Sequence, residues 1–232
     1  MNVVITGASK GIGKSIAEGF ASKGADLFLC SRNMSKTMPW QLELMKKHSI
    51  NITSFDADLS KLEEVKSFAK HILGATDQID VLINNTGTYE PGSTYNEEEG
   101  QLEKMLNVNL FSAYNLTRAL IGAMIKMKAG HIFNICSIAS LNAYANGGSY
   151  SISKWALAGF SKNLREELKN HHIKVTSVYP GATLTSSWDG MNIDPKRILE
   201  TADITKMILA ASELSIQACV EEIVIRPQLG DL

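Results

Sequence analysis

Short apolar runs recur along the chain, and longer stretches of mixed polarity separate them. Runs such as Val3-Val4-Ile5 and Leu27-Phe28-Leu29 have almost no polar alternation. This pattern indicates strands that are buried on both faces of a sheet. It predicts seven strands, at residues 2–6, 26–30, 52–56, 81–84, 131–136, 175–179 and 223–225.

The stretches between these runs have helical periodicity, at residues 12–23, 35–48, 61–73, 98–127, 149–170 and 201–211. In the first, Ile12, Ile16 and Phe20 recur at i, i+4 and i+8 and form one apolar face for the sheet. Glu97, Glu98 and Glu99 are expected to open the fourth helix, where carboxylates suit the helix dipole.

Helical crossovers between buried strands are typical of a parallel sheet. The predicted fold class is therefore α/β: a Rossmann fold with a doubly wound, seven-stranded parallel sheet flanked by helices. The length of 232 residues suits one domain, and no composition break marks a linker, so residues 1–232 are expected to form a single domain. The least regular segments, 88–96, 141–148 and 181–195, each follow a strand, where open α/β sheets bind their ligands.

The charge balance excludes some classes of binding partner. Lys and Arg number 23 against 24 Asp and Glu, so no global field favours nucleic acid or an anionic membrane. No apolar stretch reaches the ~18 residues that span a bilayer, and the strand-like run directly after Met1 leaves no room for a signal peptide. We expect a soluble cytoplasmic protein with neither nucleic acid nor membrane as partner.

The three cysteines, Cys30, Cys136 and Cys219, have no CxxC spacing, and each lies in an apolar run that is expected to be a strand. They are interpreted as small core side chains in a reducing compartment. His171-His172 is typical of a solvated helix end. No metal site is therefore expected.

A glycine-rich loop, Thr6-Gly-Ala-Ser-Lys-Gly-Ile-Gly13, joins the first strand to the first helix. Gly7, Gly11 and Gly13 allow a tight turn and a close approach of the backbone to a pyrophosphate, and the helix N-terminus offers free N–H groups to the anion. The spacing GxxxGxG differs from the GxGxxG fingerprint, so the loop alone could also be a structural turn.

The end of the second strand indicates which dinucleotide is preferred. NAD enzymes commonly place a carboxylate there for the ribose 2′-hydroxyl, but this chain has Cys30-Ser31-Arg32-Asn33. Arg32 could hold a 2′-phosphate, with Ser31 as hydroxyl donor and Lys10 as a second cation. NADP is therefore predicted, the alternative being that both cations are solvated surface charges.

Tyr150 and Lys154 are i and i+4 neighbours in the fifth predicted helix. Lowering a tyrosine pKa from ~10 to ~7 requires about 4 kcal/mol of phenolate stabilisation, which a nearby ammonium and a cationic nicotinamide can supply. Ser137 ends the fifth strand, where its hydroxyl can reach a carbonyl beside the tyrosine, and Asn109 lies in the preceding long helix. The predicted catalytic residues are Asn109, Ser137, Tyr150 and Lys154.

In this combination the chain resembles the short-chain dehydrogenase/reductase family over essentially its whole length. The matching motifs are TGASKGIG at 6–13, NNTG at 84–87, Asn109, Ser137, YSISK at 150–154 and PGATLT at 180–185. One departure is Thr86, where the family usually has Ala, which adds bulk beside the cofactor without removing a catalytic atom.

The resemblance implies roles for further residues. Asp58 would bind the adenine amino group, Lys154 the nicotinamide ribose, and Thr185 the carboxamide. Asn109 would anchor a proton-relay water, and Asn84 would support the central strand and the cofactor site. In the family's mechanism, hydride passes between nicotinamide C4 and the carbonyl carbon, Ser137 polarises the oxygen and Tyr150 donates the proton. The cofactor-binding set implied by the motifs is Gly7, Ser9, Lys10, Gly11, Ile12, Gly13, Ser31, Arg32, Asp58, Leu59, Asn85, Thr86, Gly87, Tyr150, Lys154, Pro180, Gly181, Thr183 and Thr185.

The substrate is less defined. The N-terminal motifs are similar to those of NADP-dependent 3-oxoacyl-[acyl-carrier-protein] reductases, whereas PGATLTSSW and the C-terminal segment 222–232 are similar to bacterial sepiapterin-reductase-like members. Both imply reduction of a small carbonyl or acyl thioester by NADPH. The resemblance implies a ketoreductase like the 3-oxoacyl-[acyl-carrier-protein] reductases, the alternative being a sepiapterin-reductase-like or other small-carbonyl reductase. Ser137 would contact the substrate carbonyl. Tyr144 and Trp188 could stack on a flat substrate or only pack the loops. Trp155 is expected mainly to pack.

One alternative function and one expected assembly concern the whole protein. A non-catalytic NADP-binding sensor or scaffold could have the same fold, although the intact catalytic set argues against it. The resemblance also implies a homodimer or homotetramer formed through the two long helices, with Phe111, Leu116, Trp155 or Phe160 as outward contacts.

Overall fold

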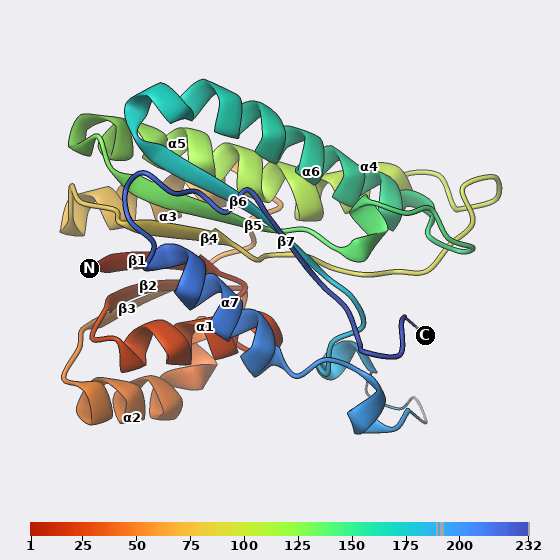
Figure 1. The fold of residues 1–232 in the computed structure, drawn as a ribbon, viewed down its shortest axis with the longest axis horizontal. Coiled ribbons are helices and arrows are strands. Elements are labelled where there is room, and N and C mark those ends of the chain that lie inside the picture. Colours follow the sequence, from red (N-terminus) through yellow and green to blue (C-terminus); the bar gives the residue numbers. More distant parts are fainter. Residues whose placement is uncertain (189, 191–192, 232) are drawn as a thin grey trace.

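The computed structural model describes residues 1–188, 190 and 193–231 and contains a parallel sheet with helices on both faces (Figure 1). The strand order is β3-β2-β1-β4-β5-β6-β7, and every neighbouring pair is parallel. The described strands are β1 (Asn2–Thr6), β2 (Asp26–Ser31), β3 (Ile52–Asp56), β4 (Val81–Asn84), β5 (Gly130–Ile135), β6 (Ile173–Pro180) and β7 (Glu222–Ile225). The predicted doubly wound sheet is confirmed.

Helices form the two outer layers. The α-helices are α1 (Gly11–Ser22), α2 (Met38–His48), α3 (Leu62–Ala75), α4 (Gln101–Leu106), α5 (Ser112–Met127), α6 (Gly148–Leu168) and α7 (Thr201–Ser212). α1, α2 and α7 cover one face, and α3, α5 and α6 cover the other (Figure 1). Among the described residues, no helix is both long and apolar enough to cross a membrane.

The core consists of two apolar layers separated by the sheet. Side chains of successive strand residues point to opposite faces, so Val3 and Ile5 pack in the layer with α1 and α7, whereas Val4 packs in the layer with α3 and α5. Ile16 and Phe20 of α1 are fully buried, as the predicted apolar face of that helix requires.

The predicted long helix at 98–127 begins later than expected and is not uniform. Gly100 has a φ of +85°, a left-handed conformation that a helix interior does not allow, and α4 starts directly after it. Residues 107–111 then form a π-helical turn before α5. Glu97, Glu98 and Glu99 therefore lie outside the helix that they were expected to open.

The cysteines match their predicted surroundings only in part. Cys30 in β2 and Cys136 just after β5 are buried, and burial raises the pKa of these thiols to about 12 and about 11. Cys219 is only partly buried and precedes β7. The predicted strand placement of Cys219 is wrong because β7 begins at Glu222.

The strand order reverses between β1 and β4, which are neighbours in the sheet although two strands separate them in sequence. Ligands of open α/β sheets bind at such a switch point, beyond the carboxyl ends of the strands. The glycine-rich loop follows β1 there, and Asn85, Thr86 and Gly87 follow β4. The fold therefore places two of the predicted motifs at one edge of the sheet.

Candidate active site

Ser137 follows β5 and is held by a short helical turn. Its Oγ accepts a hydrogen bond from the Ala139 N–H at 3.2 Å, and Ser140 Oγ accepts one from the Ser137 N–H at 3.2 Å. This capping box orients the serine hydroxyl. The same side chain forms a hydrogen bond with Tyr150 in the first turn of α6. The structure thus brings together two of the predicted catalytic residues.

The phenol of Tyr150 is protonated at neutral pH. Burial raises its pKa above the ordinary value of 10, and the hydrogen bond with Ser137 only partly opposes this effect. The prediction that Lys154 and a cationic nicotinamide together draw this pKa toward ~7 concerns the protein with its cofactor and stays a prediction. In the chain alone, desolvation has the largest effect on the phenol, and the ammonium bonds to Ile135.

Lys154 lies one helical turn after Tyr150 and is almost completely buried. Its Nζ donates a hydrogen bond to the Ile135 carbonyl at the end of β5, at 2.8 Å. Burial lowers the pKa of this ammonium from 10.5 to about 8. A β-carbon placed on Gly87 would lie 3.4 Å from Nζ, so the lysine also reaches the loop after β4.

Asn109 is buried in the π-helical turn, an irregularity that often marks functional sites. Its Oδ1 accepts from the Thr88 N–H at 2.7 Å, and its Nδ2 donates to the Thr88 carbonyl at 3.1 Å and to Ser153 Oγ at 2.8 Å. Asn109 therefore joins the loop after β4 to α6. Its predicted role in a proton relay stays a prediction.

The glycine-rich loop has the geometry that close backbone packing requires. Gly7 and Gly11 have φ values of +64° and +56°. A β-carbon on Gly13 would overlap the Gly7 carbonyl, and one on Gly7 would lie 2.8 Å from Asn85 Nδ2. Ser9, Lys10 and Ile12 lie in the same turn, and Lys10 occupies the N-cap of α1 without a side-chain capping bond.

Asn85 and Thr86 are anchored to the glycine-rich loop. Both backbone N–H groups donate to Thr6 Oγ1, at 2.9 Å and 3.0 Å. Asn85 Nδ2 also donates to the Thr6 and Gly7 carbonyls, at 3.0 Å and 3.2 Å. Asn84, at the end of β4, is buried and donates to Thr117 and Asn134 side chains, which supports the central strand as predicted.

The predicted cations lie directly after β2 and in the glycine-rich loop. Arg32 and Lys10 are exposed, and Ser31 is half-buried. The charge of Arg32 contributes to a lowered pKa of Asp58, although hydrogen bonds from Ser60 contribute more. The roles of Arg32 and Asp58 toward one ligand stay predictions.

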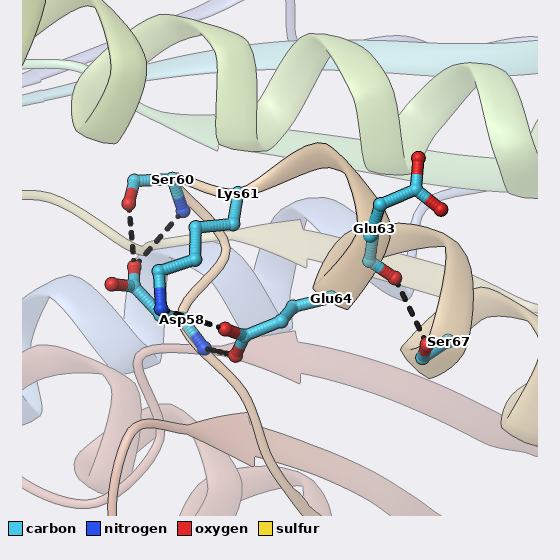
Figure 2. A network of polar contacts seen from close by, with 6 residues as sticks. All are labelled: Asp58, Ser60, Lys61, Glu63, Glu64 and Ser67. Carbon is cyan, nitrogen blue, oxygen red and sulfur yellow. Dashed lines mark hydrogen bonds and ion pairs between the residues drawn. The ribbon is translucent and has the colours of Figure 1, made fainter.

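Asp58 is the centre of a polar network (Figure 2). Its Oδ1 accepts from the Ser60 N–H at 3.1 Å and the Ser60 Oγ at 2.7 Å. Its backbone N–H donates to Glu64 Oε2 at 2.6 Å, and Glu64 Oε1 accepts from Lys61 Nζ at 2.9 Å. The neighbouring Leu59 is buried. The turn between β3 and α3 is consequently held in place before any ligand binds.

The loop after β6 contains the last of the predicted cofactor residues. Pro180 ends that strand, and the buried Thr183 pairs with Leu199 in a parallel bridge. Thr183 Oγ1 donates to the Gly181 carbonyl at 2.9 Å. A β-carbon on Gly11 would lie 3.3 Å from Thr185 Cγ2, so this loop reaches the glycine-rich loop. Of the predicted substrate segment 181–195, positions 189, 191 and 192 lie outside the described residues.

Two tyrosines flank Tyr150, and only Tyr144 was among the predicted substrate residues. The Tyr89 ring lies edge-on to the Tyr150 ring, with centroids 4.9 Å apart, and its side chain hydrogen-bonds Tyr144. Tyr89 and Tyr144 are 42% and 45% exposed, which leaves both accessible to a ligand. Tyr89 was missed, although it lies in the segment 88–96 that was expected to contact substrate. Trp188 lies on the separate loop after β6, and its role stays a prediction.

The candidate interface residues differ in exposure. Phe111 and Trp155 are 41% and 49% exposed, as an outward contact requires, so the expectation that Trp155 mainly packs is wrong. Leu116 is fully buried between α5 and the sheet, and Phe160 packs on Tyr114 with ring centroids 5.4 Å apart. The outward placement of Leu116 is therefore also wrong, because that side of α5 covers the core.

Comparisons with known proteins agree with this arrangement. The family model described as short chain dehydrogenase matches residues 1–196. A sepiapterin reductase of Chlorobaculum tepidum is 30% identical and aligns with 99% of this chain and 97% of its own length. A 3-oxoacyl-[acyl-carrier-protein] reductase of Chlamydia trachomatis is 31% identical, over 82% of this chain and 76% of its own.

Solved structures are also similar. A metagenomic short-chain oxidoreductase in complex with NADP superposes with a TM-score of 0.85 at 32% identity, covering 98% of this chain and 97% of its own. The two named reductases act on different substrates at nearly equal identity. The similarity therefore extends to the fold and the reaction class but does not select a substrate.

Proposed function

Because this chain belongs to the short-chain dehydrogenase family, we propose that it is an NADP(H)-dependent oxidoreductase that interconverts a small carbonyl compound and its alcohol. The observation that carries the proposal is the position of Ser137, whose capping box holds it after β5 and whose side chain acts on the Tyr150 phenol at the start of α6. A half-buried, protonated phenol with an adjacent hydroxyl is suited to giving a proton to a carbonyl oxygen.

The residues present fit a dinucleotide with a 2′-phosphate. Gly7 and Gly13 let the glycine-rich loop pack closely at the N-terminus of α1, and α1 has no capping side chain that competes for its free N–H groups, which can bind a pyrophosphate. Arg32 and Lys10 are exposed cations for the phosphate, and Asp58 is held in place for the adenine. NADPH supplies a hydride when it is bound.

The chain's own groups then manage the carbonyl oxygen. Ser137 donates a hydrogen bond to that oxygen, and Tyr150 transfers its proton as negative charge develops there. Lys154 is close to Gly87 at the end of β4, where its ammonium can hold the ribose hydroxyls. Its pKa of about 8 keeps most of it charged at neutral pH.

The substrate proposed is a compact, planar carbonyl compound. Tyr89 and Tyr144 are accessible aromatic rings from two different loops beside the proton donor, and such rings stack on flat conjugated groups. This feature is consistent with the similarity to a sepiapterin reductase. A 3-oxoacyl thioester is the second candidate, supported by the similarity to the chlamydial reductase.

The proposed assembly is a homodimer or homotetramer. Trp155 on α6 and Phe111 before α5 expose large apolar surfaces on neighbouring elements, and large exposed aromatic side chains are typical of protein interfaces. Sedimentation of the wild-type chain and of Trp155→Glu tests this proposal. A monomeric wild type would contradict it.

The decisive experiment is NADPH oxidation in the presence of a panel of sepiapterin, small diketones and acetoacetyl thioesters. We expect the wild type to reduce a planar carbonyl compound and Tyr150→Phe to lose roughly 10²- to 10⁴-fold in kcat. NADPH binding by Tyr150→Phe should be unchanged, as measured by fluorescence titration. Unchanged turnover in this variant would refute the proton-transfer role, and NADPH binding without turnover on any carbonyl would favour a sensor.

A further inference from the structure

The helix that carries Tyr150 and Lys154 has no cap of its own. Its N-cap residue, Gly147, has no side chain that could accept a hydrogen bond, and the first turn of α6 contains no acidic residue. Backbone N–H groups in the first turn of a helix have no partner within the helix, and they favour a nearby negative charge. The first turn of α6 therefore lacks a side-chain acceptor from its own helix.

Glu97 provides this acceptor. The Ser149 N–H donates to Glu97 Oε1 at 2.9 Å and to Oε2 at 3.2 Å, and the Ser149 hydroxyl also donates to Oε2. Glu97 is half-buried, while Glu98 and Glu99 beside it are exposed. Of the three glutamates that were expected to open one helix, Glu97 instead caps another, 52 positions further along the chain.

Three further features show how close this contact is. The Gly92 N–H donates to the Asn146 carbonyl at 3.1 Å, and the Ser93 hydroxyl donates to Asn146 Oδ1 at 2.9 Å. Gly148 has a φ of +40°, and a β-carbon there would overlap the Glu97 carboxylate and lie 2.6 Å from the Gly92 carbonyl oxygen. The segment 88–97 is thus packed directly on the start of α6.

The same segment carries Tyr89, whose ring packs on Tyr150. Asn109 holds the first residue of this segment, Thr88, by two hydrogen bonds. The last residue of the segment, Glu97, is held by its hydrogen bond with Ser149. Tyr150 directly follows Ser149 in the first turn of α6. Any displacement of that turn moves the phenol relative to Ser137, which lies on the separate β5 connection.

We propose that Glu97 is a positioning residue that fixes the first turn of α6, and with it the Tyr150 phenol, against the segment 88–97. Glu97 acts through Ser149 and does not contact the reacting atoms. The proposal rests on the proposed function, whose reaction supplies one of its readouts. The second readout, amide hydrogen exchange, does not depend on any reaction.

The test compares Glu97→Ala with Glu97→Gln and with the matched control Glu98→Ala. A misplacement of about 1 Å can cost on the order of 100-fold in rate, so we expect Glu97→Ala to lower kcat roughly 10- to 100-fold. Glu97→Gln should keep most of the wild-type kcat because its amide oxygen can still accept the Ser149 N–H. Glu98→Ala should match the wild type, and all three should bind NADPH with the wild-type dissociation constant.

Amide exchange at 149–151 should be faster in Glu97→Ala and unchanged in Glu98→Ala. Gly148→Ala disturbs the same contact, because its β-carbon would overlap the Glu97 carboxylate, and it should also speed exchange and lower kcat. This second variant keeps the test valid if Glu97→Ala does not fold. Wild-type kcat in Glu97→Ala would overturn the proposal, and so would a loss of NADPH affinity that matches the loss of kcat. A wild type that reduces no carbonyl would count against the proposed function, and the exchange data would still decide the role of Glu97.

Discussion

The ring of Tyr89 stands edge-on to the ring of Tyr150, with an interplanar angle of 83° and a centroid distance of 4.9 Å. Edge-to-face packing of this kind is worth about 0.5–1.5 kcal/mol beyond buried area. Tyr89 thus contacts the proton donor directly from the segment after β4. It also hydrogen-bonds Tyr144, so the three tyrosines form one aromatic cluster where the substrate is predicted to bind.

Replacing Tyr89 should therefore affect substrate binding. We expect Tyr89→Ala to raise KM for a planar carbonyl about three- to tenfold, because one of the two accessible stacking surfaces is lost. Tyr89→Phe, which keeps the ring, should have a smaller effect. Tyr95→Ala is the control, since Tyr95 lies in the same connection but is 89% exposed. Steady-state kinetics with equal KM for Tyr89→Ala and Tyr95→Ala would contradict the stacking role.

Arg32 should determine the choice of dinucleotide. Hydrogen bonds to charged groups contribute about 1.5–3 kcal/mol, so Arg32→Asp should weaken NADPH binding roughly 10- to 100-fold and NADH binding much less. Lys47→Asp, at the far end of α2, makes the same charge change at an exposed position and should leave both affinities nearly unchanged. An equal loss for NADPH and NADH in Arg32→Asp would remove Arg32 from the 2′-phosphate site.

Gly13 should not tolerate a side chain. In Gly13→Ala the β-carbon would overlap the Gly7 carbonyl, which is backbone, so the loop must move. Overpacking of this kind costs about 1–3 kcal/mol, and we expect lower stability together with weaker NADPH binding. Gly122→Ala in α5 is the control, because nothing lies within 4 Å of its β-carbon. That variant should be stabilised by about 0.5–1 kcal/mol. Thermal unfolding and NADPH titration of both variants check this contrast, and wild-type behaviour of Gly13→Ala would refute it.

His131 should make the fold sensitive to acid. It is buried in β5, and its Nε2 lies 2.7 Å from Thr176 Oγ1, which itself donates to the Val220 carbonyl. Nε2 is therefore the protonated nitrogen, and Nδ1 has no hydrogen-bond partner among the described residues. Burial lowers the pKa of this histidine from 6.5 to about 3.

Between these two pKa values the unfolded chain binds a proton that the folded chain does not bind. Stability therefore falls as the pH drops below about 6.5, by about 1.4 kcal/mol per pH unit, until the folded pKa is reached. From pH 7 to pH 5 the loss from this one group is about 2 kcal/mol. Urea unfolding at both pH values should show a smaller loss in His131→Gln, and an equal loss in that variant would contradict the assignment.

Much of the molecule follows from local pattern. Buried strands such as Val3-Val4-Ile5 and the apolar face of α1 require a parallel sheet covered by helices, because no other arrangement buries both. The glycines at 7, 11 and 13 and the i, i+4 spacing of Tyr150 and Lys154 are local features, and sequence alone predicts them. The first and last residues of single elements depend on backbone conformations that the sequence pattern does not show. One example is the left-handed Gly100, directly after which α4 begins.

Other features exist only because the chain folds back on itself. The pKa of Tyr150 in the chain alone is raised because burial is a property of the whole fold, and the neighbouring lysine bonds to Ile135. Glu97 caps α6, and Tyr89 packs on Tyr150. These residues lie far apart in the sequence, so hydrophobic periodicity does not predict their contacts. The sequence by itself determined the fold class and the chemical groups of the site. Tertiary structure decided their protonation and their positioning, because both depend on which distant segments exclude water and meet at one end of the sheet.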